Sequence, residues 1–171
     1  MIHHDLTPNN IMLTTDADLK IILQQWKKTS NSPAGTAEYM APEVLACSYK
    51  NGVEYNDKAD MWSLGITDIK MAEGHLSYSK LPIKKLIRET IYGPPPSLTQ
   101  GRCEECLQKQ PARRPSARQL LSHPFIRNIW DEGGINIKQH IQRYGPVRHW
   151  LSVEPMAVSS TNQIQTIIPP S

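Results

Sequence analysis

The chain has 171 residues, a formal net charge of +3 at pH 7, and 39% hydrophobic residues. This length suits one domain with a sizeable core. The mild and dispersed positive charge does not argue for binding to nucleic acid or to an anionic membrane. The longest aliphatic run is Ile21–Leu23, far below the roughly 18 apolar residues of a membrane span. We therefore expect no membrane insertion, and a cytoplasmic protein is the default.

The three cysteines, Cys47, Cys103 and Cys106, occur without a repeated spacing. Their odd number argues against a disulfide framework. Cys103 and Cys106 form a C-x-x-C, but there is no second pair and no His at zinc-finger spacing. A reduced helical pair is therefore favoured over metal or redox use.

The chain opens with a polar loop at residues 3–10 that runs directly into a short apolar segment, Ile11–Leu13, which we expect to be a strand. Polar side chains placed so close to a buried strand often take part in catalysis or binding. Asp5 and Asn10 are the candidates for such a role. A metal cluster among the adjacent His and Asp side chains is disfavoured, because neighbouring side chains diverge on an extended backbone. A plain Asx-turn is the alternative for the Asp and the Asn.

A polar turn at residues 14–18 and a second apolar segment, Leu19–Leu23, follow this strand. Two apolar segments joined by a short polar connection predict a β-hairpin. The next stretch, residues 26–34, is a polar loop with several hydroxyl side chains. These hydroxyls are chemically capable of phosphorylation, but a solvated linker is the favoured interpretation.

Residues 56–74 carry the strongest helix pattern in the sequence. Asp57 is the expected N-cap and Gly74 the expected stop. Because apolar residues occur nearly all round this helix, we expect it to be buried. A further helix is expected at Pro82–Ile91, with Pro in its first turn and an apolar stripe along one face.

The later part of the chain predicts smaller elements. Residues 153–171 are polar and contain prolines, so disorder is expected there. We divide the chain into a folded domain at residues 1–127 and a tail at residues 128–171. The elements expected before residue 153 are helices at Glu104–Gln110 and Ser116–Ser122, a break at Gly133-Gly134, and one amphipathic helix at residues 135–144.

The spacing of the opening loop, His3-His4-Asp5-Leu6-Thr7-Pro8-Asn9-Asn10-Ile11-Met12-Leu13, resembles the catalytic loop of eukaryotic protein kinases, H-R-D-L-K-P-x-N-I-L. This resemblance implies that Asp5 is the base that accepts the proton of the substrate hydroxyl. It also implies that Asn10 takes part in cofactor binding by holding magnesium. His4 stands in place of the family's Arg, and Thr7 in place of the Lys of serine/threonine members.

The same resemblance places Leu23-Gln24-Gln25 at the D-F-G motif, whose Asp chelates magnesium. The carboxylate, the Phe and the Gly of that motif are all missing at these positions. Asp16 and Asp18 lie too early in the sequence to substitute for the carboxylate. The polar loop at residues 26–34 corresponds to the activation loop, and the Arg that receives its phosphate is replaced by His4.

A second long match covers Gly35–Glu43, which reads G-T-A-E-Y-M-A-P-E against the family's G-T-x-x-Y-M-A-P-E. Thr36 agrees with a Ser/Thr preference and is counted with the catalytic residues. The resemblance implies that Glu43 pairs with a buried Arg, for which Arg114 is the candidate, and that Asp60 binds the catalytic-loop backbone. By themselves the two acidic residues would be ordinary first-turn carboxylates favoured by the helix dipole.

The triple proline at residues 94–96 and the L-L-S-H-P-F-I ending at residues 120–126 resemble the sterile-twenty-like branch of serine/threonine kinases. That branch includes the germinal-centre kinases and the kinase heads of class III myosins. The resemblance extends over residues 2–127 in unbroken order. The structural residues that it implies are His3, Glu43, Asp60 and Arg114.

The expected fold class is mainly α, a protein-kinase C-lobe with a short β-hairpin at the active-site edge. The sequence contains no Gly-rich loop or paired Lys of an N-lobe, so we expect the N-lobe to be absent. The expected function is a partial serine/threonine protein kinase domain that is inactive as this chain. ATP and Mg²⁺ are the cofactors that the resemblance implies, and we expect this chain not to bind them. The expected partner is a protein substrate or another protein, with no nucleic acid.

Two alternatives remain open at this point. One is a pseudokinase-like module that binds proteins through its middle and late helices. The other is a truncated gene product that does not fold stably.

Overall fold

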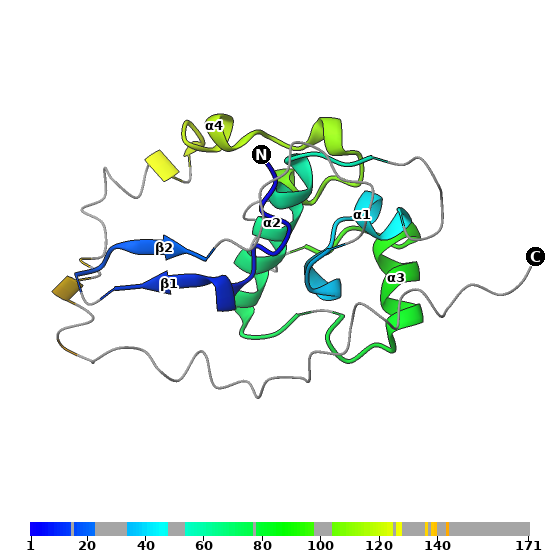
Figure 1. Ribbon diagram of the computed structural model, residues 1–171, viewed down its shortest axis with the longest axis horizontal. Helices are drawn as coiled ribbons and strands as arrows, with labels where there is room; N and C mark the ends of the chain where they lie inside the picture. The colour runs from blue at the N-terminus through cyan, green and yellow to red at the C-terminus, as the bar shows by residue number, and fades with distance from the viewer. Residues whose placement is uncertain are drawn as a thin grey trace, which may run out of the picture.

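The computed structural model describes residues 1–14, 16–22, 34–47, 54–76, 78–97, 104–124, 126–127, 136, 138–139 and 143. In chain order its strands and helices are β1 (Ile11–Leu13), β2 (Leu19–Ile21), α1 (Pro42–Ala46), α2 (Lys58–Glu73), α3 (Ile83–Tyr92) and α4 (Ala117–Leu120). Short 3₁₀ turns occur at Pro8–Asn10, Ala37–Tyr39, Glu104–Leu107 and Pro111–Arg113. Figure 1 shows α2 in the centre, with α1 and α3 to one side and the hairpin of β1 and β2 projecting from the other. The described part is therefore mainly helical with one small antiparallel sheet, as predicted.

The predicted hairpin is present. Strands β1 and β2 pair antiparallel, with Ile11 opposite Ile21 and Leu13 opposite Leu19. The first strand has its predicted bounds, whereas the second ends at Ile21 instead of Leu23. Ile22 is no longer in the strand, but its backbone N–H still donates to the carbonyl oxygen of Asn10 at 2.8 Å. Leu23 and the two Gln residues after it lie outside the described residues.

Helix α2 is buried on nearly every side, as its apolar composition predicted. Trp62 and Ile69 are each 1% exposed. The helix ends at Gly74, which adopts the left-handed conformation with φ of 75° that glycine reaches without steric cost. Asp57 occupies the predicted N-cap position, but its side chain makes no capping hydrogen bond. The side chain of Asn56 instead accepts a hydrogen bond from the backbone N–H of Lys58 at 3.0 Å.

The core forms where other segments pack onto α2. A Cβ atom added at Gly65 would lie 2.9 Å from the Leu107 side chain, so a larger residue here would force the packing of the 3₁₀ turn at Glu104–Leu107 to shift. Helices α1 and α3 pack against each other and close the core on the other side. The core residues that are buried to 5% exposure or less include Ile2, Ala41, Val44, Leu45, Tyr55, Ile66, Leu86 and Ile87.

The later elements are shorter than the sequence patterns predicted. A helix was expected at Glu104–Gln110, but only Glu104–Leu107 forms, as a 3₁₀ turn. Helix α4 covers the centre of the helix expected at Ser116–Ser122, and Ser116 starts it with a capping box that includes Gln119.

Cys106 is buried, and this burial raises the pKa of its thiol to about 11. Such a thiol stays protonated near neutral pH. The expected helical pair with Cys103 stays a prediction, because Cys103 lies outside the described residues.

Several predictions fall on residues that the structure does not describe. The polar loop at residues 26–33 and the tail at residues 144–171 are among them, as is Cys103. Of the helix expected at residues 135–144, Lys138, Gln139 and Arg143 are helical. Among the described residues, no helix combines the length and the apolar character needed to cross a membrane.

Candidate functional site

The Asp5 carboxylate is the centre of the candidate site. Its Oδ1 atom accepts hydrogen bonds from the backbone N–H of Thr36 at 3.0 Å and from the Thr36 hydroxyl at 2.9 Å. Its Oδ2 atom accepts one from the side-chain amide of Asn10 at 2.8 Å. The same amide nitrogen donates to the Asp5 backbone oxygen at 2.7 Å. The structure thus brings together Asp5, Asn10 and Thr36, which lie in two separate stretches of the sequence.

Asp60, in the first turn of α2, holds the backbone of the opening loop. Its two carboxylate oxygens accept hydrogen bonds from the backbone N–H groups of His3 at 2.7 Å and His4 at 3.1 Å. Burial raises the pKa of the Asp60 carboxyl, and these two hydrogen bonds oppose that rise. The loop that presents Asp5 is therefore fixed to the buried helix α2.

Two further polar residues of α2 bind the same region, and neither was predicted as a site residue. The Thr67 hydroxyl donates to the Leu6 carbonyl oxygen at 3.0 Å, and the Ser63 hydroxyl donates to the Tyr39 carbonyl oxygen at 2.8 Å. Together with Asp60, these residues follow the i, i+3, i+7 spacing of one helix face. This polar stripe on an otherwise apolar helix was the signal that could have identified them.

The two histidines of the opening loop have different environments. The His3 ring lies inside, with its Nε2 atom 2.7 Å from the Ile22 carbonyl oxygen, and so connects the loop to the end of β2. The His4 backbone has φ of 73°, which is uncommon for a residue other than glycine. Its ring packs edge-on against Tyr55, with Nδ1 3.0 Å from the tyrosine hydroxyl. The His4 side chain is therefore directed to Tyr55 and supplies no guanidinium to the loop.

Gly35 is needed where the two parts of the site meet. Its φ of +109° is a conformation that side chains rarely tolerate. A Cβ atom at this position would lie 2.2 Å from the His4 carbonyl oxygen and 3.4 Å from the Asp5 carboxylate. Glycine therefore allows the segment that carries Thr36 to approach Asp5.

Glu43 and Arg114 form a two-pronged ion pair, with distances of 2.6 Å between Nη1 and Oε1 and 2.7 Å between Nη2 and Oε2. Arg114 is 1% exposed. Its remaining donors bind the carbonyl oxygens of Gln108 at 2.7 Å and Lys58 at 2.8 Å. The guanidinium also lies 5.2 Å from the centre of the Trp62 ring. This cluster joins α1, the start of α2 and the segment before α4.

The described residues do not provide a fitting magnesium site. Magnesium takes hard oxygen ligands, commonly one or two carboxylates together with phosphate oxygens. Next to Asp5, Asn10 supplies one amide oxygen, and no group of three or more His, Cys, Asp or Glu side chains in the described part of the chain converges as a metal site. The Thr7 side chain is 3% exposed and uncharged, so it does not replace the family's Lys as a phosphate-facing cation. We therefore derive no step through a bound metal.

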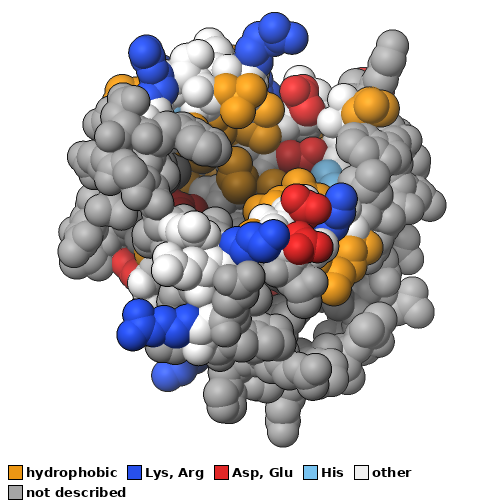
Figure 2. All heavy atoms as spheres, turned by 90° about the vertical axis from the view of Figure 1, so that its left-hand side faces the viewer, with side chains coloured by type: hydrophobic (Ala, Val, Ile, Leu, Met, Phe, Trp, Pro, Cys, Tyr) orange, Lys and Arg blue, Asp and Glu red, His pale blue; other side chains and the backbone are white. Residues whose placement is uncertain are grey.

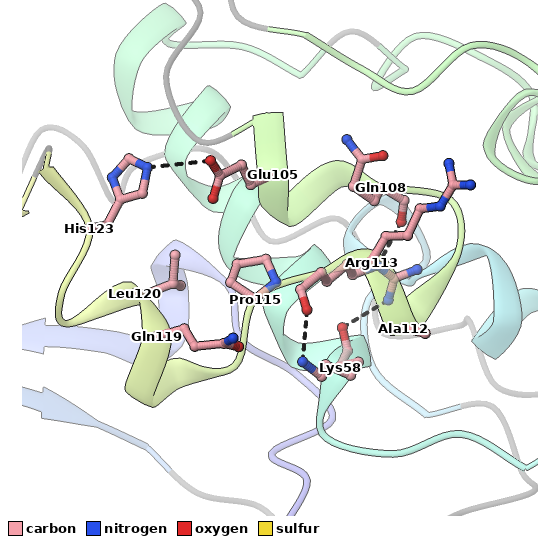
Figure 3. A pocket seen from close by; sticks show the side chains of 10 residues that line it. Lys58, Glu105, Gln108, Ala112, Arg113, Pro115, Gln119, Leu120 and His123 are labelled. Carbon is pink, nitrogen blue, oxygen red and sulfur yellow. Dashed lines mark hydrogen bonds and ion pairs between the residues drawn. The ribbon is translucent and has the colours of Figure 1, made fainter.

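A separate hollow of about 560 Å³ lies between α4 and the start of α2. Figure 3 shows Lys58 and Arg113 at its wall, with a dashed line joining His123 to Glu105, whose atoms lie 3.7 Å apart. None of Asp5, Asn10 and Thr36 lines this hollow. It therefore belongs to the face that the Glu43–Arg114 cluster supports and not to the candidate site.

Tyr39 gives the site a measurable pH signature. Burial raises its pKa to about 12, with smaller contributions from the negative charges of Glu38 and Asp5. The unfolded chain ionises this phenol near 10. The folded state therefore holds the proton more tightly between these values, and the contribution of Tyr39 to stability is lost as the pH rises from about 10 to about 12.

A titration of phenolate absorbance tests this prediction. Tyr39→Phe should remove a transition near pH 12, whereas the control Tyr92→Phe, at a side chain that is 83% exposed, should leave that transition in place. Loss of a transition near pH 10 in Tyr39→Phe would show that the phenol is not shielded as the structure implies.

Comparison with known proteins identifies related sequences. The family described as "Protein kinase domain" matches residues 1–126. Myosin-IIIb of Mus musculus is 36% identical over 143 residues, which are 74% of this chain and 11% of that protein. Serine/threonine-protein kinase 10 of Xenopus tropicalis is 36% identical, over 75% of this chain and 15% of its own length. Serine/threonine-protein kinase mig-15 of Caenorhabditis elegans is 35% identical, over 84% of this chain and 15% of its own length. The chain thus spans a small part of these relatives.

Proposed function

The chain belongs to the protein kinase family, and from this membership we propose that residues 1–127 form the helical C-lobe of a serine/threonine kinase of the sterile-twenty-like branch. The observation that carries the proposal is the convergence of Asp5, Asn10 and Thr36 at one carboxylate. In this proposal, Asp5 occupies the position of the family's catalytic base and Asn10 that of the amide that helps to hold magnesium in the family. The mainly helical fold with a single hairpin supports the assignment to the C-lobe.

The hydrogen bonds around Asp5 indicate which oxygen would accept a substrate proton. Each carboxylate oxygen has about two lone-pair sites. Oδ1 already accepts two bonds from Thr36, whereas Oδ2 accepts one from Asn10. In a complete kinase domain with this carboxylate, a serine or threonine hydroxyl of a protein substrate would therefore bind Oδ2 and transfer its proton there, while its oxygen attacks the γ-phosphorus of ATP and ADP leaves.

We further propose that the chain as given is catalytically inactive. Leu23 stands at the position of the metal-binding carboxylate, and Thr7 at that of the catalytic-loop Lys. Loss of one preorganised charge-stabilising group can cost about 3 to 4 kcal/mol in a transition state. The 171 residues also contain no Gly-rich loop to cover a nucleotide.

The second candidate is a protein-binding pseudokinase module, and one observation favours it. The groups that hold the fold are intact, since Asp60 binds the loop backbone and Glu43 binds Arg114, whereas Thr7 and Leu23 replace two charged groups that act on ATP in the family. A fold that keeps its supporting contacts but lacks two of these charged groups fits protein binding better than catalysis. The third hypothesis is a truncated gene product that does not fold stably, and it predicts no cooperative unfolding.

A thermal-shift titration with magnesium ATP tests these readings. A ligand present at 100 times its Kd stabilises a protein by about 2.7 kcal/mol, which would raise the Tm by several degrees in a protein of this size. We expect cooperative unfolding with no such shift, and no phosphate transfer to a generic Ser/Thr substrate. A shift in the unaltered chain, or phosphate transfer that Asp5→Asn abolishes and the exposed control Asp16→Asn leaves unchanged, would contradict inactivity. A molten or aggregated chain would favour the third reading.

A further inference from the structure

The hollow between α4 and the start of α2 carries positive charge that is available to a ligand. Lys58 and Arg113 both line it. Within the part of the chain that the structure describes, neither of these side chains makes an ion pair. Arg114 lines the hollow as well, but the Glu43 carboxylate already compensates its charge. Two cations at the wall therefore remain for an anionic partner.

The Lys58 ammonium is held in position without being neutralised. Its Nζ atom donates a hydrogen bond to the Arg114 carbonyl oxygen at 2.7 Å, and an ammonium group has three donors. The Lys58 backbone is fixed in turn, because its carbonyl oxygen accepts a hydrogen bond from Arg114 Nη1 at 2.8 Å. Two N–H groups of the ammonium thus remain for an anion, and the side chain has little freedom left to lose on binding.

The rest of the lining indicates what kind of anion fits. Pro115 and Leu120 give the hollow an apolar part, and Glu105 is the one carboxylate among the described residues that line it. Figure 3 shows Lys58 and Arg113 apart from each other, so they match two separate single charges better than one compact phosphate group. The volume of about 560 Å³ lies within the range of about 300–1,000 Å³ that is usual for ligand sites.

We propose that this hollow binds an acidic peptide segment of a partner protein. Two carboxylates of the segment pair with Lys58 and Arg113, as charge-assisted hydrogen bonds favour. An apolar side chain between them packs against Pro115 and Leu120. The proposal goes beyond the proposed function and does not depend on kinase activity, because the Asp5 carboxylate does not line the hollow.

The hairpin side of the molecule is a less suitable surface for the same peptide. Figure 2 shows that hydrophobic side chains surround the hollowed centre of that side and that acidic side chains lie next to them. Like charges repel, so carboxylates of a ligand are disfavoured there. An acidic segment should therefore select the hollow beside α4.

Fluorescence anisotropy of a labelled peptide, measured with the full chain, tests the site. The probe is a short peptide of glutamates around one central leucine, with both ends blocked. Its matched control carries glutamine in place of each glutamate. We expect the glutamate peptide to bind, the glutamine peptide not to bind, and the binding to weaken as added salt screens the charges.

Variants of the chain locate the binding. Arg113→Glu should weaken the affinity for the glutamate peptide by at least about fivefold, because attraction becomes repulsion. Glu105→Gln should strengthen it, because this change removes the carboxylate that lines the hollow. Lys84→Glu is the matched control, since it reverses the same charge on α3 at a residue that does not line the hollow. All three side chains are exposed, so the fold should be retained.

Three outcomes would overturn the proposal. The first is equal binding, or no binding, of the glutamate and glutamine peptides. The second is an equal loss of affinity in Arg113→Glu and Lys84→Glu, which would show a general attraction to a chain of net positive charge. The third is binding of a phosphoserine peptide in the absence of binding of the glutamate peptide, because the hollow would then select phosphate.

Discussion

Replacing Arg114 by Ala is expected to lower the free energy of unfolding by about 3 to 5 kcal/mol. The guanidinium is fully buried, and its removal would leave the Glu43 carboxylate, only 14% exposed, without its partner. The carbonyl oxygens of Gln108 and Lys58 would lose their donors as well. Buried polar groups without partners are costly, so the loss should far exceed that of a surface ion pair.

The neighbouring Arg113 gives a matched control, because it is exposed and one position away. Arg113→Ala should change stability by no more than about 0.5 kcal/mol. Denaturant unfolding of both variants and of Glu43→Ala provides the measurement. The double variant of Glu43 and Arg114 should cost less than the sum of the single ones, because neither charge is then left alone. A negligible effect of Arg114→Ala in a chain that unfolds cooperatively would mean that the pair does not hold these segments together.

Long-range contacts were predictable where a family motif fixed the partner. Glu43 and Arg114 are far apart in sequence, and no periodicity in the chain links them. Their contact followed from the resemblance to the kinase family, which pairs the Glu of the Gly35–Glu43 segment with a buried Arg, here Arg114. The bounds of β1 and the burial of α2 followed from apolar patterning alone.

Predictions were less successful where neighbouring residues compete for one capping role, or where tertiary contacts compete with helix formation. Asp57 lies at the predicted N-cap position, but the side chain that accepts the capping bond is that of Asn56, because both are good capping residues and the backbone dihedrals decide between them. The helix expected at Glu104–Gln110 ends early because the Gln108 carbonyl oxygen accepts a bond from buried Arg114. Tertiary packing there overrides helix propensity. Ser63 and Thr67 were not predicted, because apolar periodicity predicts which face of a helix is buried and assigns no partner to the polar residues on it.

Repair of the replaced motifs should not restore phosphoryl transfer in this 171-residue chain. Leu23→Asp, Gln24→Phe and Gln25→Gly would supply the family's metal ligand, apolar side chain and glycine. Phosphoryl transfer, however, depends mainly on the positioning of ATP against the acceptor. No segment of this sequence carries the motifs that cover the nucleotide.

An N-lobe from a related kinase, added by fusion or in trans, should therefore raise the activity of the repaired chain by at least about 10³-fold over repair alone. Such a lobe would cover apolar groups at the hairpin that are now partly exposed, among them Leu13 at 47% and Ile22 at 43%. Radiolabelled phosphate incorporation into a generic Ser/Thr substrate would be measured for all four combinations of repair and N-lobe. Asp5→Asn in the most active combination serves as the control and should remove the incorporation, since it abolishes the proposed base. Robust activity from the repaired chain without an N-lobe would show that the chain already positions ATP, and that the replaced motif was its main defect.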